Sequence, residues 1–71
     1  MIVIYTRNSC AWCNTVKRYL TGKGKEFTVK NIDEDPEALA EYKTFGVTTV
    51  PVTVGNGYPV FGWRPAELAK L

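Results

Sequence analysis

The stretch IVIYTRNSCAWC, residues 2–13, decides the fold because it joins a strand pattern to two cysteines. Residues 2–5 are β-branched or aromatic and polar residues follow them, which is typical of a buried strand that ends in a loop. The cysteines, Cys10 and Cys13, have the spacing C-x-x-C. The loop after the first strand therefore carries the candidate reactive side chains.

A helix is predicted from Ala11 to Leu20, directly after this loop. Apolar residues recur there at helical spacing and two glycines supply a stop, which places Cys10 at the beginning of the helix. The side chain of Cys13, one turn further along, points toward the apolar stripe. The residues concerned are Cys13, Val16, Leu20, Gly22 and Gly24.

A second strand and a second helix are predicted between residues 27 and 46. Acidic residues at 33–35 suit the positive end of a helix dipole, and Pro36 suits the first helical position. Gly46 fits a left-handed turn at the end of the helix. The apolar positions are Phe27, Val29 and Ile32 in the strand and Ala38, Leu39, Tyr42 and Phe45 in the helix.

The last third of the chain predicts a hairpin and a short helix. Two short apolar runs, 50–54 and 58–61, surround Gly55, Asn56 and Gly57, which tolerate positive φ and favour a tight turn. Pro65 then opens a helix over residues 66–71, with Leu68 and Leu71 placed for packing.

The order of these elements is βαβαββα. A right-handed crossover makes the first two strands parallel, and the tight turn makes the last two antiparallel. The sequence thus predicts an α/β fold with a four-stranded mixed sheet flanked by three helices, in a single domain over residues 1–71. A chain of this length buries a modest core, so we expect its function on the surface.

Composition argues against several classes of function. The net charge is +2, and the basic residues of 17–30 are interrupted by apolar and turn residues, which predicts a solvated face rather than nucleic-acid binding. No run approaches the roughly 20 apolar residues of a membrane span, and residues 1–5 lack a signal-peptide layout. Two cysteines this close cannot form the framework of a secreted mini-protein. We therefore expect a cytoplasmic protein.

A C-x-x-C at a helix start inside a βαβ pattern predicts thiol–disulfide exchange. The thiolate is the nucleophile in this chemistry, and free N–H groups and the helix dipole stabilise negative charge at this end of a helix. Cys10 is therefore the predicted nucleophile. Cys13 is the predicted resolving thiol, because it can displace the reduced target from a mixed disulfide with Cys10.

The cysteine pair and one proline leave alternatives open. The pair could be half of a zinc site, or it could be two inert buried cysteines. Zinc usually takes four Cys or His ligands, and the chain has two Cys and no His. Only a site shared between subunits would therefore complete the zinc coordination. Pro51 lacks the N–H of a central strand, which indicates an edge or a special turn. Most X-Pro bonds are trans, so composition does not predict a cis bond here.

The segments YTRNSCAWC (5–13), TTVP (48–51) and GWRP (62–65) together resemble the NrdH-redoxin family, glutaredoxin-like members of the thioredoxin superfamily. The resemblance spans nearly the whole chain. It implies the thioredoxin fold, with Pro51 cis and facing the dithiol and with the backbone of Val50 offered to the partner's extended chain. It also implies that electrons pass from thioredoxin reductase to class Ib ribonucleotide reductase.

No tightly bound cofactor is implied besides the redox-active disulfide Cys10–Cys13, and we expect a monomer. Phe61 stands where these redoxins usually have Ser, Trp63 replaces the usual Phe, and the inner pair Ala11-Trp12 differs from the common ones. Trp63 could instead cover one end of the core, and Arg7 could be a solvated charge rather than a group that lowers the pKa of Cys10. The candidate partner-binding residues are Arg7, Ala11, Trp12, Val50, Pro51, Gly62, Trp63 and Arg64.

Two competing functions follow from the same residues. The first is a glutathione-dependent glutaredoxin, also an oxidoreductase. The second is a non-enzymatic thioredoxin-fold module that binds a metal or a cluster between subunits. Dithiol activity without metal distinguishes the second from both enzymes.

Overall fold

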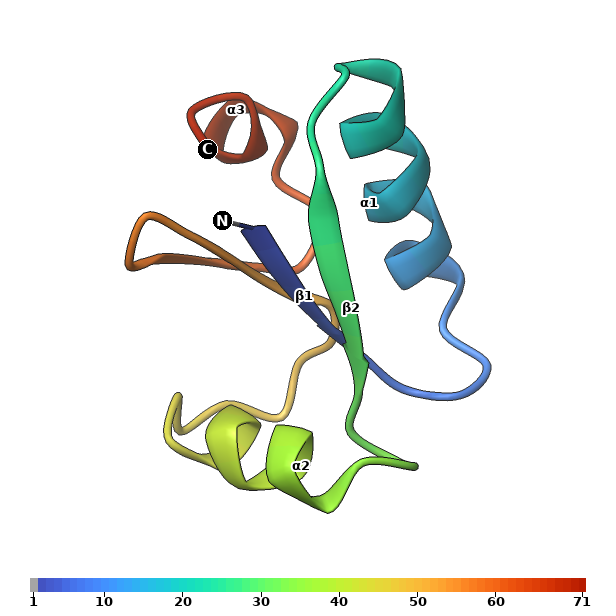
Figure 1. The fold of residues 1–71 in the computed structure, drawn as a ribbon, viewed down its shortest axis with the longest axis vertical. Coiled ribbons are helices and arrows are strands. Elements are labelled where there is room, and N and C mark those ends of the chain that lie inside the picture. Colours follow the sequence, from blue (N-terminus) through green and yellow to red (C-terminus); the bar gives the residue numbers. More distant parts are fainter. Residues whose placement is uncertain (1) are drawn as a thin grey trace.

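The computed structural model describes residues 2–71 and confirms the predicted order of elements. The polypeptide alternates strand and helix up to the final hairpin, as Figure 1 shows. The elements are β1 (Ile2–Thr6), α1 (Ala11–Gly22), β2 (Phe27–Asn31), α2 (Pro36–Lys43), β3 (Val52–Gly55), β4 (Tyr58–Phe61) and α3 (Pro65–Leu68).

The four strands form one mixed sheet in the order β2-β1-β3-β4. The crossover through α1 makes β1 parallel to β2, whereas β3 is antiparallel to both β1 and β4. β1 and β3 are thus the central strands, and β2 and β4 are the edges. This is the mixed sheet that the sequence pattern predicts, and its arrangement is the thioredoxin fold that the resemblance implies.

The alternation of side chains along β1 divides the core into two clusters. Ile2 and Ile4 face α1 and α3, while Val3 and Tyr5 face α2. In Figure 1, α2 accordingly lies apart from α1 and α3. The buried members are Ile2, Ile4, Val16, Leu20, Val60 and Leu68 in the first cluster and Tyr5, Ile32, Ala38, Tyr42 and Val52 in the second.

A polar network fastens α2 to the sheet. The Tyr5 hydroxyl donates to Glu41 Oε1 over 3.0 Å, and Lys30 Nζ lies 2.7 Å from the same oxygen. Hydrogen bonds from Lys30 and Tyr5 hold the pKa of the Glu41 carboxyl below its usual value, and burial together with Glu41 raises the pKa of Tyr5. One carboxylate therefore joins α2 to both parallel strands.

Several element boundaries differ from the sequence prediction. α1 continues to Gly22 because Gly24, with φ of +71°, makes the left-handed turn. β2 ends at Asn31, so Ile32 is buried just beyond the strand, and Val29 is 43% exposed because β2 is an edge strand.

Differences also occur in the C-terminal half. Phe45 lies beyond α2 yet still packs edge-to-face on Tyr5, and Gly46 does adopt the expected positive φ. β3 begins at Val52 rather than at residue 50, since Pro51 cannot donate to a strand ladder. α3 ends at Leu68, three residues earlier than predicted. No helix within residues 2–71 has the length and apolar character needed to cross a membrane.

The hairpin turn is tight and specific. Asn56 and Gly57 have φ values of 53° and 75° between the paired residues Gly55 and Tyr58. Two successive positive φ angles are those of a type I′ turn, whose twist matches that of the two strands. Its second position requires glycine for its backbone rather than for lack of space, because an added Cβ at Gly57 would meet no atom within 4 Å.

Glycine-to-alanine changes in this turn and at the end of α1 should have opposite effects on the free energy of unfolding. Gly57→Ala should lower the free energy of unfolding by roughly 1–2 kcal/mol, because alanine is disfavoured at positive φ. Gly22→Ala, at the end of α1 and equally uncrowded, should raise it by up to about 1 kcal/mol through helix propensity. Urea unfolding followed by circular dichroism measures both values. Equal shifts in the two variants would contradict this account of the turn.

Candidate active site

Three strand ends meet at one end of the sheet. Tyr5 of β1 pairs with Val52 of β3, and Val52 pairs with Phe61 of β4. β1 therefore ends where β3 begins and where β4 ends. The loop to Cys10, the Val50–Pro51 bond and the segment that starts at Gly62 all emerge from this end.

The Val50–Pro51 peptide bond is cis, in agreement with the resemblance. Pro51 is buried and precedes the first residue of a central strand, so the predicted special turn is correct and the alternative of an edge strand is wrong. The Pro51 carbonyl accepts a hydrogen bond from the Gly62 N–H over 2.8 Å, and Gly62 has φ of +76°. Gly62 thus attaches the end of β4 to the cis proline.

The loop between β1 and α1 is held from the side of β2. The Asn8 N–H donates to Asp33 Oδ2 over 2.9 Å, and the Asn31 amide donates to Asn8 Oδ1 over 2.9 Å. Ser9 has φ of 58°, which turns the chain into Cys10. The sequence analysis did not identify these residues as part of the site. The polar pair Asn8-Ser9 was a signal for the loop, but the sequence does not show which distant residues bond to it.

Cys10 and Cys13 form a disulfide at the start of α1, with their Cα atoms 5.3 Å apart. Cys10 is the N-cap of the helix, and its sulfur accepts from the Cys13 N–H over 3.1 Å. The exposed fraction of Cys13 is 2%, whereas Cys10 is only half-buried. Cys10 is therefore the more accessible sulfur, and Cys13 lies on the core side as predicted.

This arrangement favours a thiolate at Cys10 after reduction. The first turn of α1 contains no acidic residue, and its unpaired N–H groups and the helix dipole place partial positive charge beside the Cys10 sulfur. Such surroundings lower the pKa of a cysteine thiol below its ordinary value. Within residues 2–71, no three His, Cys, Asp or Glu side chains are grouped so that they could hold a metal ion.

Two tryptophans from different segments meet beside the cysteines. The ring of Trp12 stacks on that of Trp63 at a centroid distance of 6.4 Å and an interplanar angle of 22°. Trp12 is 56% exposed, while Trp63 is half-buried and packs on the core under α1 and α3. Trp63 therefore covers one end of the core and also reaches the edge of the site.

The remaining candidate residues are less tightly held. Ala11, Arg7 and Arg64 are exposed, and neither arginine takes part in an ion pair among the described residues. Val50 is half-buried against the α2 side of the core. Across residues 2–71, none of the loop and turn hydrogen bonds between backbone groups uses the amide or the carbonyl of Val50.

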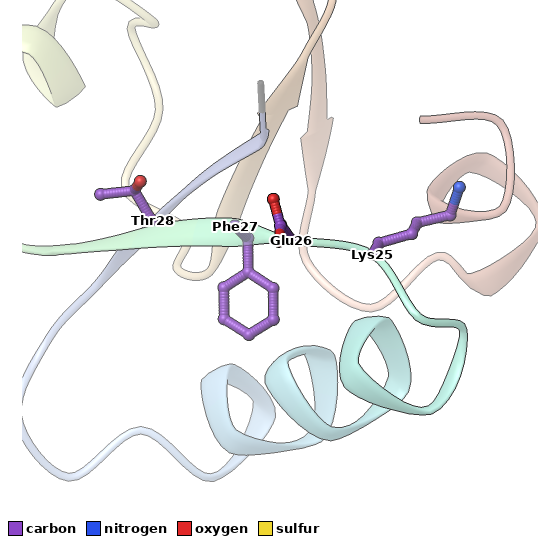
Figure 2. A pocket seen from close by; sticks show the side chains of 4 residues that line it. All are labelled: Lys25, Glu26, Phe27 and Thr28. Atoms are coloured by element: carbon purple, nitrogen blue, oxygen red, sulfur yellow. The ribbon is translucent and has the colours of Figure 1, made fainter.

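A surface hollow lies away from these residues, at the start of β2. Its lining consists of Lys25, Glu26, Phe27 and Thr28, and Figure 2 shows the Phe27 ring pointing toward α1. None of these side chains belongs to the group around the cysteines. The candidate active site is thus an exposed patch at the end of the sheet, and the hollow lies outside it.

Comparison with known proteins gives consistent results. The family model described as glutaredoxin matches residues 2–60. The chain is 37% identical over 71 residues to the glutaredoxin-like protein NrdH of Lactococcus lactis subsp. cremoris, with 100% of this chain and 99% of that protein covered. It is 34% identical to the NrdH of Escherichia coli over 70 residues, 99% of this chain and 86% of that protein.

A solved structure resembles the chain over the same length. The glutaredoxin-like protein NrdH-redoxin from Escherichia coli, studied for its thioredoxin-like activity profile, superposes with a TM-score of 0.90 at 34% identity. The match covers 99% of this chain and 92% of that one.

The position of Cys10 at the N-cap of α1 predicts which thiol reacts first. In the reduced protein, Cys10 should be alkylated before Cys13, because its pKa should lie within the roughly 3.5–7.5 range of activated thiols and its sulfur is accessible. Mass mapping after brief iodoacetamide treatment at mildly acidic pH measures the order. Preferential labelling of Cys13 would show that the two roles are assigned wrongly.

Proposed function

The chain belongs to the glutaredoxin family, among its NrdH-like thiol-disulfide oxidoreductases, and on this premise we propose that it reduces disulfides in protein partners through Cys10 and Cys13. The observation that carries the proposal is the Cys10 sulfur at the N-cap of α1, where it accepts from the Cys13 N–H. The same N–H can stabilise the attacking Cys10 thiolate.

The proposed cycle moves two electrons. The Cys10 thiolate attacks one sulfur of the partner disulfide, a mixed disulfide forms, and the other partner sulfur leaves as a thiolate that takes up a proton. Cys13, after losing its own proton, attacks Cys10 Sγ, and the second partner sulfur leaves. The partner is now a dithiol, and the Cys10–Cys13 disulfide of the structure has formed.

The cis proline supplies the proposed docking edge. Val50 lies directly before Pro51, and its backbone groups are free of loop and turn hydrogen bonds within residues 2–71. An extended partner segment can pair with such backbone groups as an added strand would. This pairing would bring the partner disulfide to the sheet end from which the Cys10 loop emerges.

The electron source in the proposal is thioredoxin reductase, and the recipient is class Ib ribonucleotide reductase. Support comes from the similarity to the NrdH-redoxin of Escherichia coli, which has a thioredoxin-like activity profile. We further propose that the chain acts in the cytoplasm as a monomer. In this proposal the cysteine pair is the whole redox centre, with no tightly bound cofactor.

The end of the site near α3 argues against glutathione as the electron source. A helix N-terminus can bind the charged end of a peptide through free N–H groups. Here the first residue of α3 is Pro65, which has no N–H, and the Arg64 N-cap makes no side-chain capping bond. The bulk of Trp63 stands directly before them, and Gly62 is followed by Trp63 rather than by an Asp that could pair with an ammonium group.

Removal of the resolving thiol should trap the partner. Cys13→Ser should accumulate a mixed disulfide between Cys10 and a substrate protein, because the intramolecular exit has been removed. Cys10→Ser, the matched control, should trap far less. Non-reducing gel electrophoresis with mass mapping of the linked peptide measures both, and equal trapping would mean that the roles are not divided between the two cysteines.

The reductase assignment predicts the result of a coupled assay. NADPH oxidation with a model disulfide should be faster with thioredoxin reductase than with glutathione and glutathione reductase, because Pro65 at the start of α3 and Trp63 just before this helix stand where glutathione would bind. The chain is held constant and only the electron source changes. Faster turnover in the glutathione system would instead support a glutathione-dependent glutaredoxin.

A further inference from the structure

We propose that Trp12, Trp63 and Tyr19 form an aromatic ladder that selects partner disulfides flanked by an apolar side chain and a carboxylate. Within this ladder, Trp12 is the contact residue and Tyr19 is a positioning residue that acts through Trp63. The inference rests on the proposed function and specifies the chemistry of the partner.

The ladder joins α1 to the connection between β4 and α3. Tyr19 packs edge-to-face on Trp63, with ring centroids 5.4 Å apart and planes at 84°, and Trp63 stacks in turn on Trp12. The Tyr19 hydroxyl donates to the Pro65 carbonyl over 3.3 Å. Two turns of α1 separate Trp12 from Tyr19, so both side chains lie on the same side of the helix. Both ends of the ladder are thus anchored to one helix.

The ladder restricts Trp12 before a partner arrives. An exposed tryptophan on a helix surface normally loses side-chain freedom when it binds, which reduces affinity. Here one face of the indole already lies on Trp63, which Tyr19 and the core hold in place. Trp12 follows Cys10 by two residues and remains 56% exposed. It is therefore an aromatic surface already arranged for an apolar side chain next to the target disulfide.

The charges beside the ladder favour an acidic partner segment. Arg64 directly follows Trp63, and Arg7 precedes Cys10 in the loop; both are exposed and without an ion pair among the described residues. The first turn of α1 has no acidic residue. Two carboxylates lie near these segments: Asp33 Oδ2 accepts from the Asn8 N–H on the β2 side, and Glu67 of α3 lines a hollow together with Arg64. A carboxylate beside the partner's apolar residue would meet guanidinium groups there.

Two disulfide-bonded peptides of equal length test this selection. One carries Leu and Glu beside its cysteines, and the other carries Ser at both positions. Stopped-flow single turnovers with the reduced protein give the rate constant for each, and bis(2-hydroxyethyl) disulfide is the small reference. The native protein should prefer the Leu/Glu peptide by about five- to tenfold, the range expected for an aromatic contact and a charged pair.

The variants separate selection from general reactivity. Trp12→Ala should lower the preference, taken as the ratio of the two peptide rate constants, to the part that the charged pair alone supplies. Tyr19→Ala should reduce the preference, and Tyr19→Phe, which keeps the ring, should restore most of it. Val29→Ala, which removes an exposed apolar side chain from the edge strand β2, is the control and should behave as the native protein. Near-ultraviolet circular dichroism should lose the signal of coupled indoles in Trp12→Ala and show a weaker one in Tyr19→Ala.

The possible failures are distinguishable. If the native protein reduces neither peptide, the proposed function is wrong. If it reduces both peptides at equal rates, or if Tyr19→Ala keeps the full preference and the indole signal, the ladder does not select partners. If Trp12→Ala slows both peptides and the small disulfide by the same factor, Trp12 acts on Cys10 reactivity and not on selection, which would also overturn the inference.

Discussion

The site depends on one hydrogen bond at the start of α1, where the first N–H groups of the helix require an acceptor from outside it. Helix N-termini leave such donors without partners inside the helix, and here the Cys10 sulfur accepts from one of them. This bond holds the Cys10 sulfur, the proposed nucleophile, at the position where the helix dipole favours negative charge. Two other features hold that helix start in place: the bond from the Asn8 N–H to Asp33 and the core that buries Cys13.

The two clusters of the core hold this end of the sheet from both of its faces. α1 is packed on one face through Val16 and Leu20, and α2 is packed on the other and also hydrogen-bonded through Glu41. The ends of β1 and β4 and the start of β3 thus meet at one end of the sheet. Pro51 and Gly62 lie there, and the loop to Cys10 emerges there, although these segments are distant in the sequence.

Sequence patterns predict those parts of the structure that depend on local chemistry. The strand-loop-helix order around Cys10 and the glycine turn at 55–57 follow from periodicity and positive φ, and the family resemblance supplied the cis proline. What could not be predicted depends on tertiary contacts. The spacing of Trp12 and Tyr19 indicates that both lie on the same side of α1. The position of Trp63 between them depends on where the chain goes after β4, which the sequence pattern does not show. The bond from Asn8 to Asp33 likewise joins segments that only the crossover brings together.

The central claim, that the start of α1 activates Cys10, is tested most directly by the pKa of this thiol. In Cys13→Ser, Cys10 is the only thiol, so the ultraviolet absorbance of the thiolate followed against pH reports its titration alone. The account predicts a midpoint within roughly 3.5–7.5, the range of thiols activated at helix N-termini. A midpoint near the ordinary value of about 8.5 would contradict it.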